Sequence, residues 1–140
     1  MCRVMFSMGI AQEDVRKVWN RADPTDPDSR LVVKTRNHPK CKVEWEWHVA
    51  PTVTVRTRWF PLVQELVIDP ALFKQPVAVA TWRGVQGDPN SALSYSGHEQ
   101  YLVGQIDPTY SSTAMFLELY RTRLLLRASK CGAPPYSYCP

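Results

Sequence analysis

The most constraining feature of the sequence is a strict alternation of apolar and polar side chains over residues 43–50. The apolar members are Val43, Trp45, Trp47 and Val49, and the polar members are Lys42, Glu44, Glu46 and His48. Successive side chains of a β-strand point to opposite faces, so this period of two predicts a strand that is buried on one side only. The fold must therefore contain a sheet with one covered face.

Further strands follow in close succession. The alternation resumes over residues 52–58 after an interruption at Pro51, and a third apolar run covers residues 63–69. Three runs separated by short breaks predict an antiparallel meander. Two shorter strands are predicted over residues 30–36 and, at a sheet edge, over residues 101–106.

Helices are predicted on either side of these strands. Residues 11–19 carry apolar side chains at helical spacing (Ala11, Val15, Val18 and Trp19), which indicates an amphipathic helix that extends back towards Cys2. A short helix is predicted over residues 76–82, a loop over 84–97, and a helix over 114–130 with Ser and Thr caps before it and Gly132 as its stop. Helices that flank the strands, rather than alternate with them, predict the α+β class with an antiparallel central sheet.

Size and charge limit the classes of protein. The chain has 140 residues, of which 44% are apolar, and a net charge of +4. This is enough chain for one domain, assigned to residues 1–140. The mild charge predicts no nucleic-acid partner, and the lack of an apolar run near the roughly 20 residues of a membrane span predicts no membrane partner.

The four cysteines are irregularly spaced and include no C-x-x-C pair. A structural zinc site needs four paired nitrogen or sulfur ligands, so no metal is expected. Cys131 and Cys139 can close a small C-terminal loop in an oxidising compartment, or remain free thiols.

Cys2, His48 and Asp69 occur in an order that a thiol enzyme can use. A helix N-terminus lowers the pKa of a thiol, an imidazole removes its proton, and a carboxylate fixes the tautomer of that imidazole. Most chains of this length contain one residue of each type, so the residues alone leave the trio open. The rival nucleophile, Cys41, lies an odd seven residues before His48, and a continuous strand would put the two on opposite faces.

Two segments carry a resemblance to a known family: Trp45-Glu46-Trp47-His48-Val49-Ala50, and Val67-Ile68-Asp69-Pro70-Ala71-Leu72-Phe73 with the later Pro76 and Trp82. This stretch, about residues 41–83, resembles the bacterial protein-glutaminases. The resemblance implies a papain-like or transglutaminase-like fold, with Cys2 on the N-terminal helix and a catalytic trio of Cys2, His48 and Asp69. Trp45 and Trp47 are candidate substrate-binding residues, although alternate aromatics on a strand are usually core and at least one is expected there.

The resemblance also implies a reaction: deamidation of glutamine side chains in proteins through a cysteine thioester, with release of ammonia and without a cofactor. The alternatives are a transglutaminase or cysteine protease that uses the same trio, or a catalytically degenerate module that binds proteins. The expected partners are a protein with an exposed glutamine and an immunity protein or pro-segment that blocks the site. The expected setting is a secreted enzyme or a bacterial toxin or effector, with this chain as the C-terminal part of a longer protein.

Overall fold

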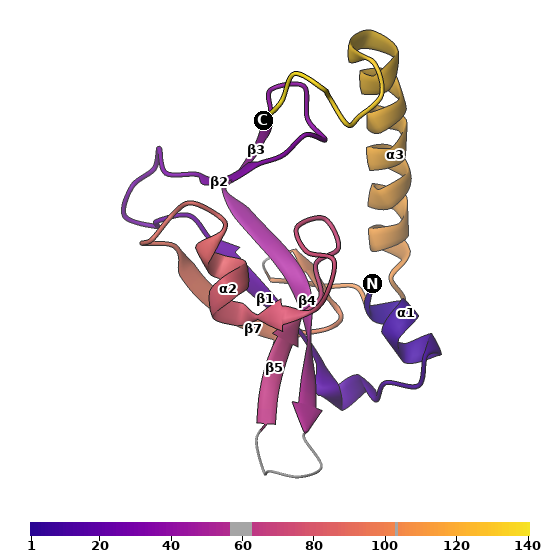
Figure 1. Ribbon diagram of the computed structural model, residues 1–140. Helices are drawn as coiled ribbons and strands as arrows, with labels where there is room; N and C mark the ends of the chain where they lie inside the picture. The colour runs from indigo at the N-terminus through magenta and orange to yellow at the C-terminus, as the bar shows by residue number, and fades with distance from the viewer. Residues whose placement is uncertain (57–62, 103) are drawn as a thin grey trace. The chain divides into compact units, whose positions relative to one another are not determined.

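The computed structural model describes residues 1–56, 63–102 and 104–140 (Figure 1). The chain divides into two compact units. The first unit contains Met1–Leu31 and Trp45–His98, and the second contains Val32–Glu44 and Glu99–Pro140. Helices and an antiparallel sheet are both present, which confirms the α+β prediction.

A five-stranded sheet forms the first unit, in the order β6-β5-β4-β1-β7, and its neighbours pair antiparallel. Its strands are β1 (Val15–Arg21), β4 (Trp47–Arg56), β5 (Val63–Val67), β6 (Val77–Ala78) and β7 (Ala92–Gly97). The second half of the alternating segment, residues 47–50, thus becomes part of the central strand β4.

The predicted helix over residues 11–19 is wrong. Helix α1 covers only Cys2–Ser7, and it is followed by the short 3₁₀ helix η1 (Gln12–Asp14) and then by β1. Val18 and Trp19 are both buried although they point to opposite faces of β1. A strand covered on both faces lacks the alternation of a half-exposed strand, so its apolar residues matched helical spacing by coincidence.

Two further boundaries differ from prediction. Glu46 separates β3 (Lys42–Trp45) from β4, whereas β4 passes without a break through Pro51. Proline lacks a backbone N–H but keeps its carbonyl, and the Pro51 carbonyl accepts a bond from the Ile68 N–H at 2.9 Å. The predicted strands over 43–50 and 52–58 are therefore not neighbours in a meander, because residues 47–50 of the first and 52–56 of the second both belong to β4. Strands β4 and β5 do pair antiparallel, as predicted; residues 57 and 58 of the predicted strand lie outside the described residues.

Helix α2 (Val79–Gly84) covers one face of the sheet with the side chain of Trp82. Trp82 is fully buried against Val18, Ala50 and Val67. The predicted helix over 76–82 is therefore partly correct, since β6 precedes α2. The predicted loop over 84–97 contains β7, an edge strand whose mostly exposed side chains give no apolar alternation.

The second unit has little secondary structure besides helix α3 (Ser111–Cys131). Strand β2 (Leu31–Lys34) pairs with β3 at the boundary of the units, and β8 (Gln100–Leu102) pairs with β9 (Gln105–Ile106). No residue of α3 is buried. The helix ends at Gly132, whose φ of +80° supports the predicted stop. Among the described residues, no helix is long and apolar enough to span a membrane.

A disulfide joins Cys41 to Cys139, and Cys131 is a free, exposed thiol. The pairing of Cys131 with Cys139 considered from the sequence is thus wrong. Cys131 is the last residue of α3, while the tail beyond it returns to the loop after β2, where the Tyr136 N–H donates to the Arg36 carbonyl at 2.8 Å. This return brings Cys139 to Cys41 rather than to its neighbour in sequence.

Candidate active site

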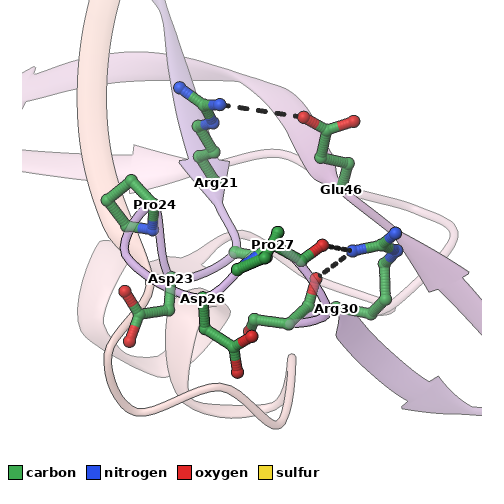
Figure 2. A pocket seen from close by; sticks show the side chains of 9 residues that line it. Arg21, Asp23, Pro24, Asp26, Pro27, Arg30 and Glu46 are labelled. Atoms are coloured by element: carbon green, nitrogen blue, oxygen red, sulfur yellow. Dashed lines mark hydrogen bonds and ion pairs between the residues drawn. The ribbon is translucent and has the colours of Figure 1, made fainter.

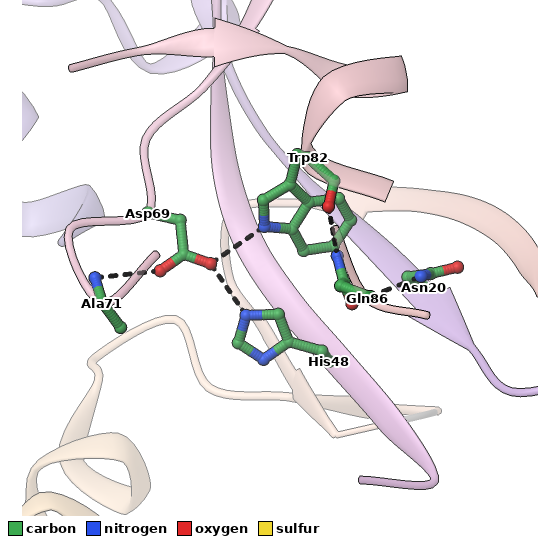
Figure 3. Close-up of polar contacts among 6 residues, drawn as sticks. All are labelled: Asn20, His48, Asp69, Ala71, Trp82 and Gln86. Atoms are coloured by element: carbon green, nitrogen blue, oxygen red, sulfur yellow. Dashed lines mark hydrogen bonds and ion pairs between the residues drawn. The ribbon is translucent and has the colours of Figure 1, made fainter. Parts of the chain in front are cut away.

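His48 and Asp69 form the polar centre of the first unit. His48 is the second residue of β4, and Asp69 lies two residues after the end of β5. Thr52 of β4 pairs with Val67 of β5 in antiparallel register, so the start of one strand lies beside the end of the other. The His48 Nε2 and the Asp69 Oδ2 are 2.8 Å apart (Figure 3). The sequence therefore predicted this pair correctly.

The carboxylate of Asp69 accepts two other hydrogen bonds. The indole Nε1–H of Trp82 donates to the same Oδ2 at 2.8 Å, and the Ala71 N–H donates to Oδ1 at 3.1 Å. The bond from the Ala71 N–H stabilises the turn that begins at Asp69-Pro70. The bonds to Oδ2 hold the carboxylate beside His48. Asp69 consequently both shapes its turn and orients the imidazole.

The charge of Asp69 is stabilised by these donors. Burial by itself raises the pKa of the Asp69 carboxyl, but the hydrogen bonds from His48 and Trp82, together with the Ala71 amide, outweigh burial and lower that pKa below its usual value. Asp69 is therefore an anion at neutral pH, as is required of a group that holds the Nε2–H tautomer of His48.

Two indoles lie almost parallel to the imidazole of His48. The ring centroid of Trp45 is 4.6 Å away with an interplanar angle of 19°, and that of Trp82 is 5.4 Å away with an angle of 26°. The sequence predicted Trp45 and His48 on opposite faces, which is wrong because the strand breaks at Glu46. Trp47 instead lies against Trp19, with their centroids 5.4 Å apart. Trp45, not Trp47, thus contacts the candidate catalytic residue.

Cys2 is the first residue of α1 and is only 5% exposed. Burial raises the pKa of its thiol above the usual value, and the Lys17 charge opposes this only in part. The sequence predicted a lowered pKa from the helix N-terminus, but α1 has six residues and its effect does not outweigh burial. Among the described residues, Cys2 and His48 form no hydrogen bond with each other. The structure thus pairs His48 with Asp69, and the role of Cys2 stays a prediction.

Cys41 is removed as a rival nucleophile in this structure, because its sulfur is bonded to Cys139. The described part of the chain has no cluster of three or more His, Cys, Asp or Glu side chains that could hold a metal ion.

A hollow of about 280 Å³ lies at the end of β1 (Figure 2). Arg21 on its wall is 3.7 Å from Glu46, and Arg30 donates to the carbonyls of Pro27 and Ser29 at 2.9 and 2.6 Å. Asp23 and Asp26 accept bonds from their own loop. Each of these charged groups thus already has a partner, mostly in the backbone of the loop itself, which indicates a structural loop rather than a ligand site.

Comparison with known proteins identifies the family. A family model described as "Glutaminase" matches residues 1–86, which is more than half of the chain and includes Cys2, His48 and Asp69. The chain belongs to this glutaminase family. No curated protein gives a significant match to the sequence.

Two solved structures are similar in fold to this glutaminase-family chain. Protein-glutaminase from Chryseobacterium proteolyticum, solved by NMR, matches at a TM-score of 0.55 and 19% identity over 91% of this chain. A crystal structure of protein-glutaminase matches at a TM-score of 0.55 and 21% identity over 99% of this chain. This chain spans 65% and 69% of those two chains. At these identities the matches establish the fold.

Sequence reasoning missed the polar role of Trp82, which it assigned to packing alone. Trp82 does pack in the core, but a buried indole N–H nearly always finds an acceptor. The sequence does carry a signal for this role, because Trp82 follows an apolar segment and Asp69, a carboxylate that accepts hydrogen bonds, lies 13 residues earlier. Which acceptor Trp82 meets depends on how α2 lies on the sheet.

Proposed function

We propose that this protein deamidates glutamine side chains of other proteins, with Cys2 as nucleophile and His48 as acid and base. The observation that carries the proposal is the pair of His48 and Asp69, held at 2.8 Å in a chain of the glutaminase family. Asp69 occupies Nε2 of the imidazole, so Nδ1 is the nitrogen left to exchange a proton with the thiol. Figure 3 shows Nδ1 on the side of the ring away from Asp69.

The reaction begins when His48 takes the proton of Cys2 and the sulfur attacks the carboxamide carbon of glutamine. Collapse of the tetrahedral intermediate breaks the C–N bond, and His48 returns the proton to the departing ammonia. Water then hydrolyses the thioester to glutamate and regenerates the thiol. Backbone N–H groups at the start of α1 are the proposed donors to the oxyanion.

In a transglutaminase an amine, instead of water, attacks the same thioester and receives the acyl group. In a cysteine protease the same trio cleaves a peptide bond. Access of water and the width of the site decide among these outcomes. Family membership supports deamidation, because the matching family model describes a glutaminase.

A secreted protein, or one delivered into another cell, is the proposed setting. The disulfide between Cys41 and Cys139 supports it, since such bonds persist in oxidising compartments. The proposed partners are a protein with an exposed glutamine and an immunity protein or pro-segment that blocks the site.

The test is ammonia release from a glutamine-rich protein such as casein, followed for the wild type and for Cys2→Ala and His48→Ala. Both variants should lose turnover by at least about 10³-fold, because each removes a member of one catalytic unit. The matched control is Cys131→Ser, which removes the exposed free thiol and should leave turnover unchanged. Full activity in Cys2→Ala would overturn the assignment of the nucleophile.

A second candidate is a catalytically degenerate module that binds proteins. It is favoured by the burial of Cys2 and the raised pKa of its thiol, since a thiol rather than a thiolate is a poor nucleophile. Iodoacetamide labelling at several pH values separates the two functions. A nucleophile activated by His48 should label rapidly near pH 7 in the wild type and slowly in His48→Ala, whereas a thiol of the degenerate module should label slowly in both.

A further inference from the structure

The bond from Trp82 to Asp69 is one link in a longer chain of buried contacts. The Gln86 side chain donates from Nε2 to the Trp82 carbonyl at 2.9 Å, and its Oε1 accepts from the Asn20 Nδ2 at 3.2 Å. Asn20 lies on β1 directly opposite His48 of β4. The contacts therefore form a closed ring that begins and ends at His48, and Figure 3 shows its members together.

The hydrogen bonds determine how the two amides of this ring are oriented. The Trp82 carbonyl can only accept, so Gln86 must present its NH₂ group to it and its oxygen to Asn20. Asn20 must then present its own NH₂ group to Gln86. No alternative assignment satisfies both bonds, so the direction of the ring is fixed.

This orientation leaves the Oδ1 of Asn20 buried and, among the described residues, without a hydrogen-bond partner. An unpaired buried acceptor is unfavourable. Asn20, Gln86 and Trp82 are all completely buried, where apolar side chains would pack without that penalty. A polar ring in this position therefore suggests a role other than stability.

We infer that Trp82 is a positioning residue for His48 and that Gln86 and Asn20 act by holding Trp82 in place. The inference rests on the proposed function, because it assigns these residues to the same reaction. The ring of Trp82 lies against the imidazole of His48 and its N–H donates to Asp69. The effect of that N–H passes through the Asp69 carboxylate.

The Oδ2 of Asp69 accepts hydrogen bonds from both Trp82 and His48. The bond from Trp82, together with the bond from the Ala71 N–H to Oδ1, holds the carboxylate plane and keeps Oδ2 aimed at Nε2 of the imidazole. Without the indole N–H, Oδ2 can rotate or bind water, and the Nε2–H tautomer loses part of its advantage. A histidine held in the other tautomer presents a proton, rather than a lone pair, at Nδ1.

The central test is Trp82→Phe, which keeps an aromatic ring and removes the N–H. We expect kcat to fall by about tenfold or more with KM little changed, in line with the cost of losing an outer partner of a functional histidine. The matched control is Trp19→Phe. Trp19 is also buried and donates its N–H to Ser96 Oγ at 2.8 Å, but it lies opposite Val49 on the other face of the sheet. This control should keep the wild-type kcat.

A second readout does not require turnover. The imidazole ¹⁵N and N–H signals of His48 report the tautomer, and the wild type should show a protonated Nε2 whose proton exchanges slowly with water. In Trp82→Phe that proton should exchange about tenfold faster or disappear, whereas Trp19→Phe should leave it unchanged. This measurement tests the ring even if the wild type releases no ammonia, so its failure is distinct from the failure of the proposed function.

Gln86→Met is the second variant, used if Trp82→Phe does not fold. It keeps the length of the side chain, removes both amide bonds and leaves the Trp82 indole in place. We expect the same changes as for Trp82→Phe, but smaller. A wild-type His48 proton signal and an unchanged kcat in a folded Trp82→Phe, or in Gln86→Met where Trp82→Phe cannot be used, would overturn the inference.

Discussion

Each of the two compact units of this protein is stabilised internally by different interactions. In the first unit, Val18, Ala50, Val67 and Trp82 form a buried core on the sheet, and the polar ring lies beside it. In the second unit, the 21 residues of α3 include none that is buried, and a disulfide and a few hydrogen bonds hold the C-terminal tail. The candidate active site lies in the unit with the packed core, as expected if catalytic side chains need rigid support.

Charge separates the units as well. The first unit has nine cationic and nine acidic side chains, while the second has eight cationic and four acidic ones, so the second unit carries the whole net charge of +4. Like charges on a unit with few buried side chains work against its compact state. The comparison therefore predicts that the second unit is the easier one to unfold.

The largest expected effect is that of removing the disulfide, by reduction or by Cys41→Ser. Cys41 and Cys139 are 98 residues apart, and cross-linking a loop of this length stabilises a protein by about 4.7 kcal/mol in the chain-entropy treatment. We expect the circular dichroism signal of α3 to decrease. All five tryptophans belong to the first unit, so tryptophan fluorescence should stay native.

Cys131→Ser is the control, because it changes a cysteine of the second unit without touching the disulfide. It should leave both signals unchanged. If fluorescence and helicity were lost together after reduction, the two units would unfold as one, and the comparison would be wrong.

Asp69→Asn tests the polar centre of the first unit. The new NH₂ group must face either Trp82 and His48 or the Ala71 N–H, so a donor meets a donor in both orientations. We expect a loss of turnover on the order of 10² or more and a loss of about 1–3 kcal/mol in the free energy of unfolding. Ammonia release and urea unfolding measure the two effects. A variant with wild-type turnover would show that Asp69 only stabilises its turn and does not orient His48 for catalysis.

A pair of alanine substitutions compares packing in the units directly. Val67 is completely buried, and Val67→Ala should cost about 2 kcal/mol through lost contacts and a small cavity. Leu125 of α3 is 67% exposed, and Leu125→Ala should change the free energy of unfolding by less than about 0.5 kcal/mol. Urea unfolding followed by fluorescence and by circular dichroism measures both. If both substitutions lowered the free energy of unfolding equally, Leu125 would have to be buried in solution and the comparison of the units would be wrong.

The smallest effect is expected from mild acid. The pKa of Asp69 is lowered in the folded protein, so its contribution to stability is complete above the unfolded pKa of about 4 and is lost as the pH falls through the folded value. The first unit of the wild type should therefore lose stability below about pH 4, and Asp69→Asn should lose less. Melting curves by fluorescence between pH 3 and 6 measure this, and equal acid sensitivity of the two proteins would contradict the assignment.

Several features were predictable from the sequence because each depends on neighbouring residues. A C-terminal helix ending at Gly132 was predicted and is found over Ser111–Cys131. The predicted Ser and Thr caps are wrong, because these residues lie inside the helix, Tyr110 is the N-cap, and Asp107 accepts from the Thr113 N–H at 2.8 Å. The period of two correctly predicted strand structure on both sides of Glu46, but neither the break at Glu46 nor the passage of β4 through Pro51. The pair of His48 and Asp69 follows from two motif segments on strands that a short connection makes antiparallel. Patterns of this kind are contained in one element or in two strands that follow each other in the sequence.

Other features were decided by the tertiary structure. The burial of β1 on both faces turned a helical pattern into a strand, the break at Glu46 brought Trp45 onto His48, and the return of the tail joined Cys139 to Cys41. The acceptor of the Trp82 N–H and the path through Gln86 to Asn20 also depend on how α2 packs against the sheet. The sequence determined which residues can bond, but their partners lie many residues away, so only the packing of the folded chain selected them.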